Sequence, residues 1–150
     1  MTTTVTSPLP GRVVGLAGVP DPVFAGAMVG PGTAIDPPRE PIEAVAPVDG
    51  QIVSMHPHAF VVMDENGHGV LTHLGIDTVT LKGKGFELLA AKGDRVKRGQ
   101  ALVKWNPADV ETAGRSPISP IVALEASAEQ LGDVVESGDV TAGSDLFTWS

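Results

Sequence analysis

The chain contains no cysteine and no tyrosine, and aromatic residues make up only 4% of its 150 residues. The lack of cysteine excludes disulfides and thiolate chemistry, so a nucleophile in this protein must be an oxygen or a nitrogen atom. A chain of this length buries a hydrophobic core without crosslinks or a structural metal. We therefore expect a single domain over residues 8–150. Residues 1–7 are rich in threonine and lack an apolar period, so we expect a flexible tail there.

Basic residues are also scarce. The chain has 10 lysines and arginines against 18 aspartates and glutamates, which gives a formal net charge of -8. Binding to a phosphate backbone needs a basic stripe, and none is visible, so we expect no nucleic-acid partner and favour a basic protein instead. The first residues lack a secretory pattern, and no apolar run reaches membrane-spanning length. We expect a cytoplasmic protein that is not embedded in a membrane.

Glycine and proline are abundant, with 18 and 13 copies, and this composition disfavours long helices. Short runs of valine, isoleucine and leucine recur between turn signals, which is typical of strands. The strands predicted in this way cover residues 12–16, 42–46, 51–55, 59–63, 70–73, 86–90 and 101–105. Short helices are predicted only after Asn106 and after Ser127. The sequence thus predicts an all-β fold, a compact antiparallel β-sandwich or barrel with few short helices.

Two parts of the sequence repeat. Residues 8–14 and 47–53 each place a Pro-x-x-Gly turn before a short strand, and residues 93–96 and 138–140 each begin with Gly-Asp before another. The second pair of segments leads towards Trp105 and Trp149 respectively. Such turns also recur by chance in glycine-rich β proteins, and that alternative stays open. The favoured interpretation is a fold built from duplicated turn-strand units.

All four histidines, at positions 56, 58, 68 and 73, lie in one short stretch. A turn at residues 66–67 is predicted to join the strands that carry His58 and His73, and antiparallel pairing would bring their side chains to one face. A neutral imidazole is a good nucleophile towards phosphorus, and a second imidazole can stabilise the phosphoryl charge. A carboxylate or a carbonyl on the other ring nitrogen would fix the tautomer. His68 follows the turn and is expected to be a solvated loop residue.

The same residues belong to longer motifs. Residues 46–50 read Ala-Pro-Val-Asp-Gly, residues 58–60 read His-Ala-Phe, and residues 73–79 read His-Leu-Gly-Ile-Asp-Thr-Val. Together these motifs resemble the glucose-type enzyme IIA family of the bacterial sugar phosphotransferase system, over nearly the whole chain. The resemblance implies a compact antiparallel β-sandwich and a phosphocarrier that uses neither a cofactor nor a metal.

The resemblance also implies roles for individual residues and partners. His73 would accept a phosphoryl group from the phosphocarrier HPr, and His58 would assist the transfer. The group would then pass to a cysteine on the IIB domain of a glucose-family sugar permease. A shallow apolar depression around the histidines would form the partner interface, since exposed apolar patches mark such surfaces. Its expected residues are Phe24, Met28, Val29, Leu71, Leu74 and Val79.

Two polar residues near the motif have open roles. His56 stands where the family usually has threonine, so a hydroxyl partner is missing; His56 either replaces that threonine in orienting the site or points to solvent. Asp77 follows His73 within the motif, and it either orients the imidazole or satisfies backbone amides in a turn.

Three other functions compete with this interpretation. A zinc site is the strongest rival, because the His56-x-His58 and His73-x-x-x-Asp77 spacings resemble, in reversed order, the ligand motifs of a family of zinc endopeptidases. A regulatory binding module is the second alternative, in which phosphorylation changes the affinity of the apolar depression for partners. Lipoyl and biotin carriers have duplicated β-units too, but no lysine here stands in the context that those carriers show.

Overall fold

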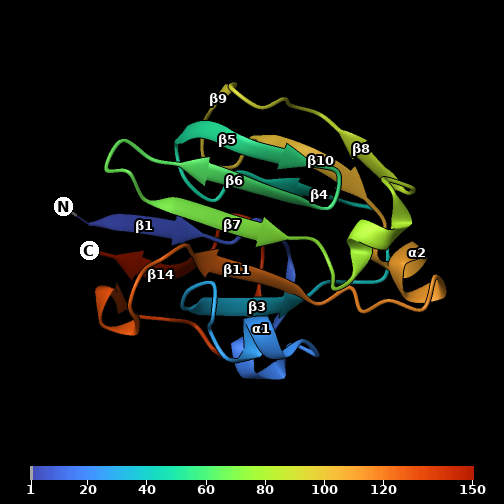
Figure 1. Cartoon of the computed structure of the whole chain (residues 1–150), viewed down its shortest axis with the longest axis horizontal. Helices are drawn as coiled ribbons and strands as arrows, with labels where there is room; N and C mark the ends of the chain where they lie inside the picture. The colour runs from blue at the N-terminus through green and yellow to red at the C-terminus, as the bar shows by residue number, and fades with distance from the viewer. Residues whose placement is uncertain (1) are drawn as a thin grey trace.

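The computed structural model describes residues 2–150, and every strand pairing in it is antiparallel. One sheet has eight strands in the order β13 (Asp139–Val140), β2 (Gly11–Val13), β3 (Gly32–Asp36), β11 (Ser119–Ala123), β7 (Gly69–His73), β6 (Ala59–Met63), β5 (Gly50–His56) and β9 (Arg95–Val96). Two smaller sheets have the orders β1 (Thr3–Thr6), β14 (Asp145–Trp149), β12 (Leu131–Gly132) and β4 (Ile42–Val45), β10 (Ala101–Trp105), β8 (Phe86–Leu88). Figure 1 shows these strands in the colours of the chain.

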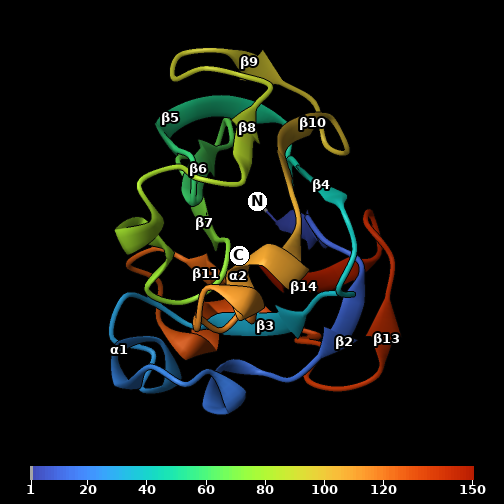
Figure 2. The same cartoon turned by 90° about the vertical axis from the view of Figure 1, so that its right-hand side faces the viewer.

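The large sheet curves around the interior, and the two small sheets lie across from it (Figure 2). The enclosed core draws residues from both ends of the chain. Its largest fully buried side chains include Leu9, Ile35, Ile52, Phe60, Leu102, Trp105, Ile121, Leu146 and Phe147. The predicted all-β antiparallel sandwich is confirmed.

Helices are few and short. They are α1 (Pro22–Ala25), α2 (Pro107–Thr112) and the 3-10 turns η1 (Leu16–Gly18), η2 (Thr78–Leu81) and η3 (Ala128–Gln130). Asn106 caps α2 as predicted, since its side chain accepts a hydrogen bond from the Ala108 amide at 3.0 Å. Ser127 starts only η3, which is shorter than expected. No helix within residues 2–150 is both long enough and apolar enough to cross a membrane.

The strand register confirms the duplicated units. Gly11 pairs with Val140 as Gly50 pairs with Val96. The large sheet is symmetric about its centre, where β7 and β11 lie side by side. From the centre outwards, β11, β3, β2 and β13 of one unit correspond to β7, β6, β5 and β9 of the other. The two smaller sheets match as well, because β14 lies between β1 and β12 as β10 lies between β4 and β8.

The two copies differ where the chemistry is expected. Matching the copies strand by strand places the Val122–Gly32 pair where the other copy has His73–Ala59. Valine carries no reactive group, so a histidine site exists in one copy only.

The prediction of a flexible tail over residues 1–7 is wrong for the part that the structure describes. Residues Thr3–Thr6 form β1 and pair with β14, and Val5 is fully buried in the core. The Ser7 amide donates to the Ser144 carbonyl at 2.7 Å. Residues 2–7 contain one apolar residue, Val5, and the partner strand lies at the other end of the sequence, so no local pattern marks β1. Met1 lies outside the described residues.

Candidate active site

His58 and His73 meet at one end of the β6–β7 hairpin. His73 is the last residue of β7 and pairs with Ala59, the first residue of β6, directly after His58. The Leu74 amide donates to the His58 carbonyl at 2.7 Å, which continues the pairing past the strand ends. The ring centroids of the two histidines are 5.2 Å apart, with an angle of 70° between the planes. Both side chains are only partly buried, so the rings face each other at the surface.

A backbone carbonyl orients the His73 ring. Its Nδ1 lies 2.5 Å from the Gly75 carbonyl oxygen. Because a carbonyl can only accept, Nδ1 carries the proton and Nε2 keeps its lone pair. Gly75 reaches this position with a φ of 82°, and a Cβ there would lie 2.8 Å from the Ser116 carbonyl oxygen. Glycine is therefore required for the turn that fixes the tautomer of His73.

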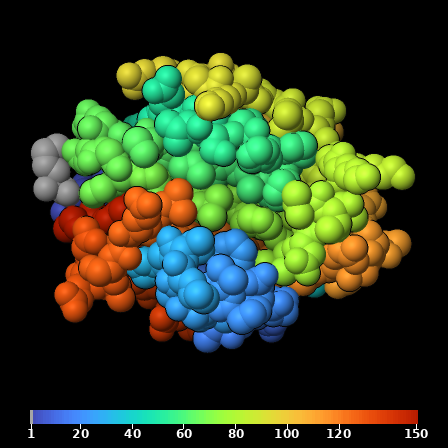
Figure 3. Space-filling model, viewed as in Figure 1, coloured from blue at the N-terminus to red at the C-terminus, as the bar shows by residue number. Residues whose placement is uncertain are grey.

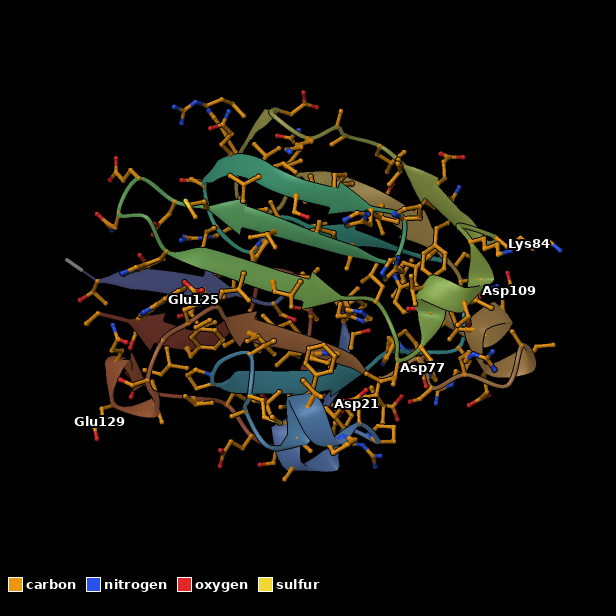
Figure 4. The ribbon with its side chains drawn as sticks, in the orientation of Figure 1. Asp21, Asp77, Lys84, Asp109, Glu125 and Glu129 are labelled. Carbon is orange, nitrogen blue, oxygen red and sulfur yellow. The ribbon has the colours of Figure 1, made fainter. Side chains whose placement is uncertain are left out.

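Asp77 does neither of the things that the sequence suggested. Its side chain is exposed, caps no amide of η2, and makes no hydrogen bond among residues 2–150. Figure 4 shows Asp77 on the loop after β7, with Asp21 nearby at the start of α1. Both carboxylates act on His73 through space, since each raises its pKa. Asp77 thus influences the ring electrostatically without orienting it.

The balance of these effects keeps both rings neutral at neutral pH. Burial lowers the pKa of His73, whereas the hydrogen bond that the ring donates to the Gly75 carbonyl and the charges of Asp21 and Asp77 raise it. The pKa of His58 is lowered by burial, and further by the positive charges that His73 and His56 can carry. A neutral His73 with a free Nε2 is a nucleophile.

The short helix α1 packs against His73 through Phe24. Phe24 in α1 lies with its ring centroid 5.2 Å from that of His73. Asp21 caps α1 by accepting from the amides of Val23 and Phe24, and Pro22 occupies the first helical position. This Asp-Pro start is a helix signal that the strand-centred interpretation of the sequence missed. On the face shown in Figure 3, the blue segment with α1 lies beside the green segment of β6 and β7.

The residues expected at the partner surface fall into two groups. Met28 and Val79 are 75% and 61% exposed, and Phe24, Val29 and Leu71 are partly exposed. Leu74 is different: it is fully buried in the core, so its assignment to the surface is wrong. Neighbouring residues of an extended segment point to opposite sides, and His73 takes the outer side. Val23, 44% exposed, lies on α1 beside Phe24 and was not foreseen.

The other two histidines have distinct surroundings. His56 ends β5, is exposed, and lies with its ring centroid 5.8 Å from that of His58. His68 is not the solvated loop residue expected: its ring stacks on Trp149 at 4.2 Å, and its Nδ1 lies 3.1 Å from the Thr3 hydroxyl. His68 therefore belongs to the packing of β1 against the hairpin.

The zinc interpretation needs at least three side chains that converge on one point. Among residues 2–150, no three histidine, aspartate or glutamate side chains gather closely enough to hold a metal ion. The spacing that suggested a zinc site therefore does not bring three such ligands together in the described part of the chain.

Comparison with known proteins decides the family. Residues 3–129 match the family described as phosphoenolpyruvate-dependent sugar phosphotransferase system, EIIA 1. The chain belongs to this family. The glucose-specific EIIA component of the phosphotransferase system from Bacillus anthracis is 38% identical to it over 143 residues, which cover 94% of this chain and 86% of that protein. The counterpart from Staphylococcus epidermidis is 40% identical over 120 residues, covering 79% and 71%.

A solved structure agrees. The glucose permease IIA from Mycoplasma capricolum superposes with a TM-score of 0.90 at 33% identity, covering 99% of this EIIA chain and 96% of that structure. The predicted enzyme IIA membership is confirmed, and the chain is a phosphocarrier of the sugar phosphotransferase system.

Proposed function

We propose that this EIIA chain accepts a phosphoryl group from HPr on Nε2 of His73 and delivers it to a cysteine on the IIB domain of a sugar permease. The observation that carries the proposal is the His73 ring itself. Its Nδ1 is held by the Gly75 carbonyl, and the His58 ring lies 5.2 Å away. Only Nε2 is left free to attack phosphorus.

The transfer balances without a metal or a cofactor. The Nε2 lone pair of His73 forms the new nitrogen–phosphorus bond, while the electron pair of the bond between HPr and phosphorus returns to HPr. In the second half, the thiolate of the acceptor cysteine attacks the same phosphorus, and the electron pair of the bond to His73 returns to Nε2. The proton stays on Nδ1, hydrogen-bonded to the Gly75 carbonyl, in both halves of the transfer, so the ring is ready for the next cycle.

His58 assists by stabilising charge. Phosphoryl transfer depends on positioning and on donors aimed at the charged oxygens. The His58 ring makes no hydrogen bond among residues 2–150, so its N–H is available to the phosphoryl oxygens. The pKa of His58 is lowered while the site is empty, and a dianion beside it acts in the opposite direction. His58 therefore becomes a stronger donor when His73 is loaded.

The surface around the histidines suits the two partners. Exposed Met28 and Val79 and the partly exposed Phe24 supply apolar contact, and Asp21 and Asp77 supply negative charge. A partner with an apolar centre and basic residues around it fits this surface. The relatives are named glucose-specific, so we infer that the acceptor serves a glucose-family permease. We propose a cytoplasmic location for this carrier.

A regulatory role follows from the same surface. Loading His73 puts a doubly charged group into an apolar contact area, which weakens binding to apolar partners and strengthens binding to basic ones. The set of partners that bind this protein would thereby depend on the fraction of the chain that is phosphorylated.

Replacing His58 with glutamine tests the proposal. The wild-type chain should take up one phosphoryl group from phosphoenolpyruvate, enzyme I and HPr, and should pass it to a purified IIB domain. His58→Gln should still be loaded but should deliver on the order of 100-fold more slowly, because one donor to the phosphoryl oxygens is lost. Rapid-quench assays with radiolabelled phosphate measure both halves. Unchanged delivery would remove His58 from the mechanism, and an unlabelled wild-type chain would refute the proposed function.

A further inference from the structure

A third imidazole lies beside the pair. The ring centroid of His56 is 5.8 Å from that of His58, and the planes are inclined by 34°. The distance is similar to the 5.2 Å between His58 and His73. The three rings therefore form a row that starts at His73 and ends at the exposed His56, with His58 in the middle.

The backbone holds this row in place. His56 pairs with Ala59 across a tight turn of Pro57 and His58, and Ala59 in turn pairs with His73. Proline fixes its own φ and restricts the residue before it, so the turn has little freedom. The loop after η2 packs on the same turn, since a Cβ at Gly83 would lie 3.3 Å from the Pro57 ring. His56 thus stays close to His58 although its side chain is exposed.

The charges around the row are unevenly placed. Asp21 on α1 and Asp77 before η2 act on His73. The charged group that acts on His58 from the other side is His56, and Lys82 and Lys84 flank Gly83 in the loop on Pro57. Neither the His56 ring nor the His58 ring makes a hydrogen bond or an ion pair within the described chain. A charge on His73 or on His56 therefore acts directly on the His58 ring, which lies between them.

We propose that His56 is a positioning residue that acts through His58 and couples proton uptake to the loading of His73. When the site is empty, a positive charge on His56 disfavours a second positive charge on His58, whose pKa it lowers. A dianionic phosphoryl group on His73 offsets that repulsion and draws protons to both rings. The inference rests on the proposed function, since it needs a phosphoryl group on His73.

The coupling has a measurable consequence. Loading then combines two events: one phosphoryl group moves from HPr to His73, with the electron pair of the broken bond returning to HPr, and protons are taken up from solvent. Each proton taken up changes the equilibrium constant by about tenfold per pH unit where the ring titrates. Lower pH then favours the loaded chain over loaded HPr. A proton taken up by His56 makes the plot of the logarithm of this equilibrium constant against pH steeper by up to about one unit.

The test is the equilibrium distribution of phosphoryl group between HPr and this chain, measured between about pH 5.5 and 8, where histidine titrates. His56→Gln should flatten the pH slope relative to wild type. His56→Lys keeps a permanent positive charge, so it should keep the chain well loaded and flatten the slope as well. His68→Gln replaces a histidine outside the row and should leave the slope unchanged, provided that circular dichroism shows it folded.

A second measurement avoids the transfer reaction. Ring-proton NMR of the unloaded chain should show His58 titrating at higher pH in His56→Gln than in wild type, because the charge on His56 lowers the pKa of His58. Equal pH slopes in wild type and His56→Gln, or an unmoved His58 titration, would overturn the inference. A wild-type chain that takes up no phosphoryl group would instead refute the proposed function, so the two failures are distinguishable.

Discussion

Replacing His73 with alanine should abolish loading, with a loss on the order of 10⁴-fold or more, which is typical when a covalent nucleophile is removed. The reason is the arrangement of the free nitrogens at the site. Nε2 of His73 is aligned by the Gly75 carbonyl, whereas the rings of His58 and His56 have no such partner among residues 2–150. Neither should replace it as the acceptor. Incubation with phosphoenolpyruvate, enzyme I and HPr, followed by quantification of bound phosphate, measures the loss.

His68→Ala is the matched control for this experiment. His68 lies on the same hairpin, but its ring stacks on Trp149 instead of facing the other histidines. It should be loaded like wild type, provided that it is folded. Persistent labelling of His73→Ala at the wild-type rate would show that another residue carries the phosphoryl group.

Replacing Val5 with aspartate should have the largest effect on stability. Val5 is fully buried in the main core, although it lies in a segment that the sequence marks as a tail. A carboxylate there has no partner, and an uncompensated buried charge costs about 3–5 kcal/mol. Because small domains are stable by only about 5–15 kcal/mol, a large share of the stability would be lost. Urea denaturation followed by tryptophan fluorescence measures the change.

Thr4→Asp is the control for Val5→Asp. It places the same charge on the neighbouring residue of β1, which is only partly buried and whose carbonyl accepts from Arg98. We expect a change of less than about 1 kcal/mol, as at most surface positions. Similar effects of the two substitutions would mean that β1 does not dock with Val5 facing the core.

The site was predictable to the extent that it is local. His58 and His73 lie at one end of a hairpin whose turn carries Asn66 and Gly67, so the register follows from a short piece of sequence. The sequence predicts that either a carboxylate or a carbonyl orients the imidazole, and the structure shows the carbonyl of Gly75 in this role. Choosing it required the left-handed conformation of that glycine, which depends on packing against Ser116 and Thr78.

Contacts between distant segments were missed. The helix that brings Phe24 to His73 is four residues long, too short for an apolar period. β1 pairs with β14, and β3 pairs with β11, across most of the chain. Leu74 is a different kind of error. The alternation of an extended segment already implied that His73 and Leu74 face opposite sides, so this signal was present in the sequence.

The duplication explains how a glycine-rich β fold acquires a site at one place only. Both copies supply the same frame of paired strands, and β7 and β11 meet at its centre. The residues differ: His73 in one copy corresponds to Val122 in the other, and Ala59 corresponds to Gly32. The frame therefore positions the imidazoles, while the side chains at the end of a single hairpin decide the chemistry.

The most direct test of the account is to identify the nitrogen that carries phosphorus. Protein labelled with ¹⁵N-histidine is loaded from phospho-HPr and examined by ¹⁵N and ³¹P NMR. The hydrogen bond between Nδ1 of His73 and Gly75 predicts a single phosphorus, bonded to Nε2 of that ring. Phosphorus on Nδ1, or on any residue other than His73, would contradict the account.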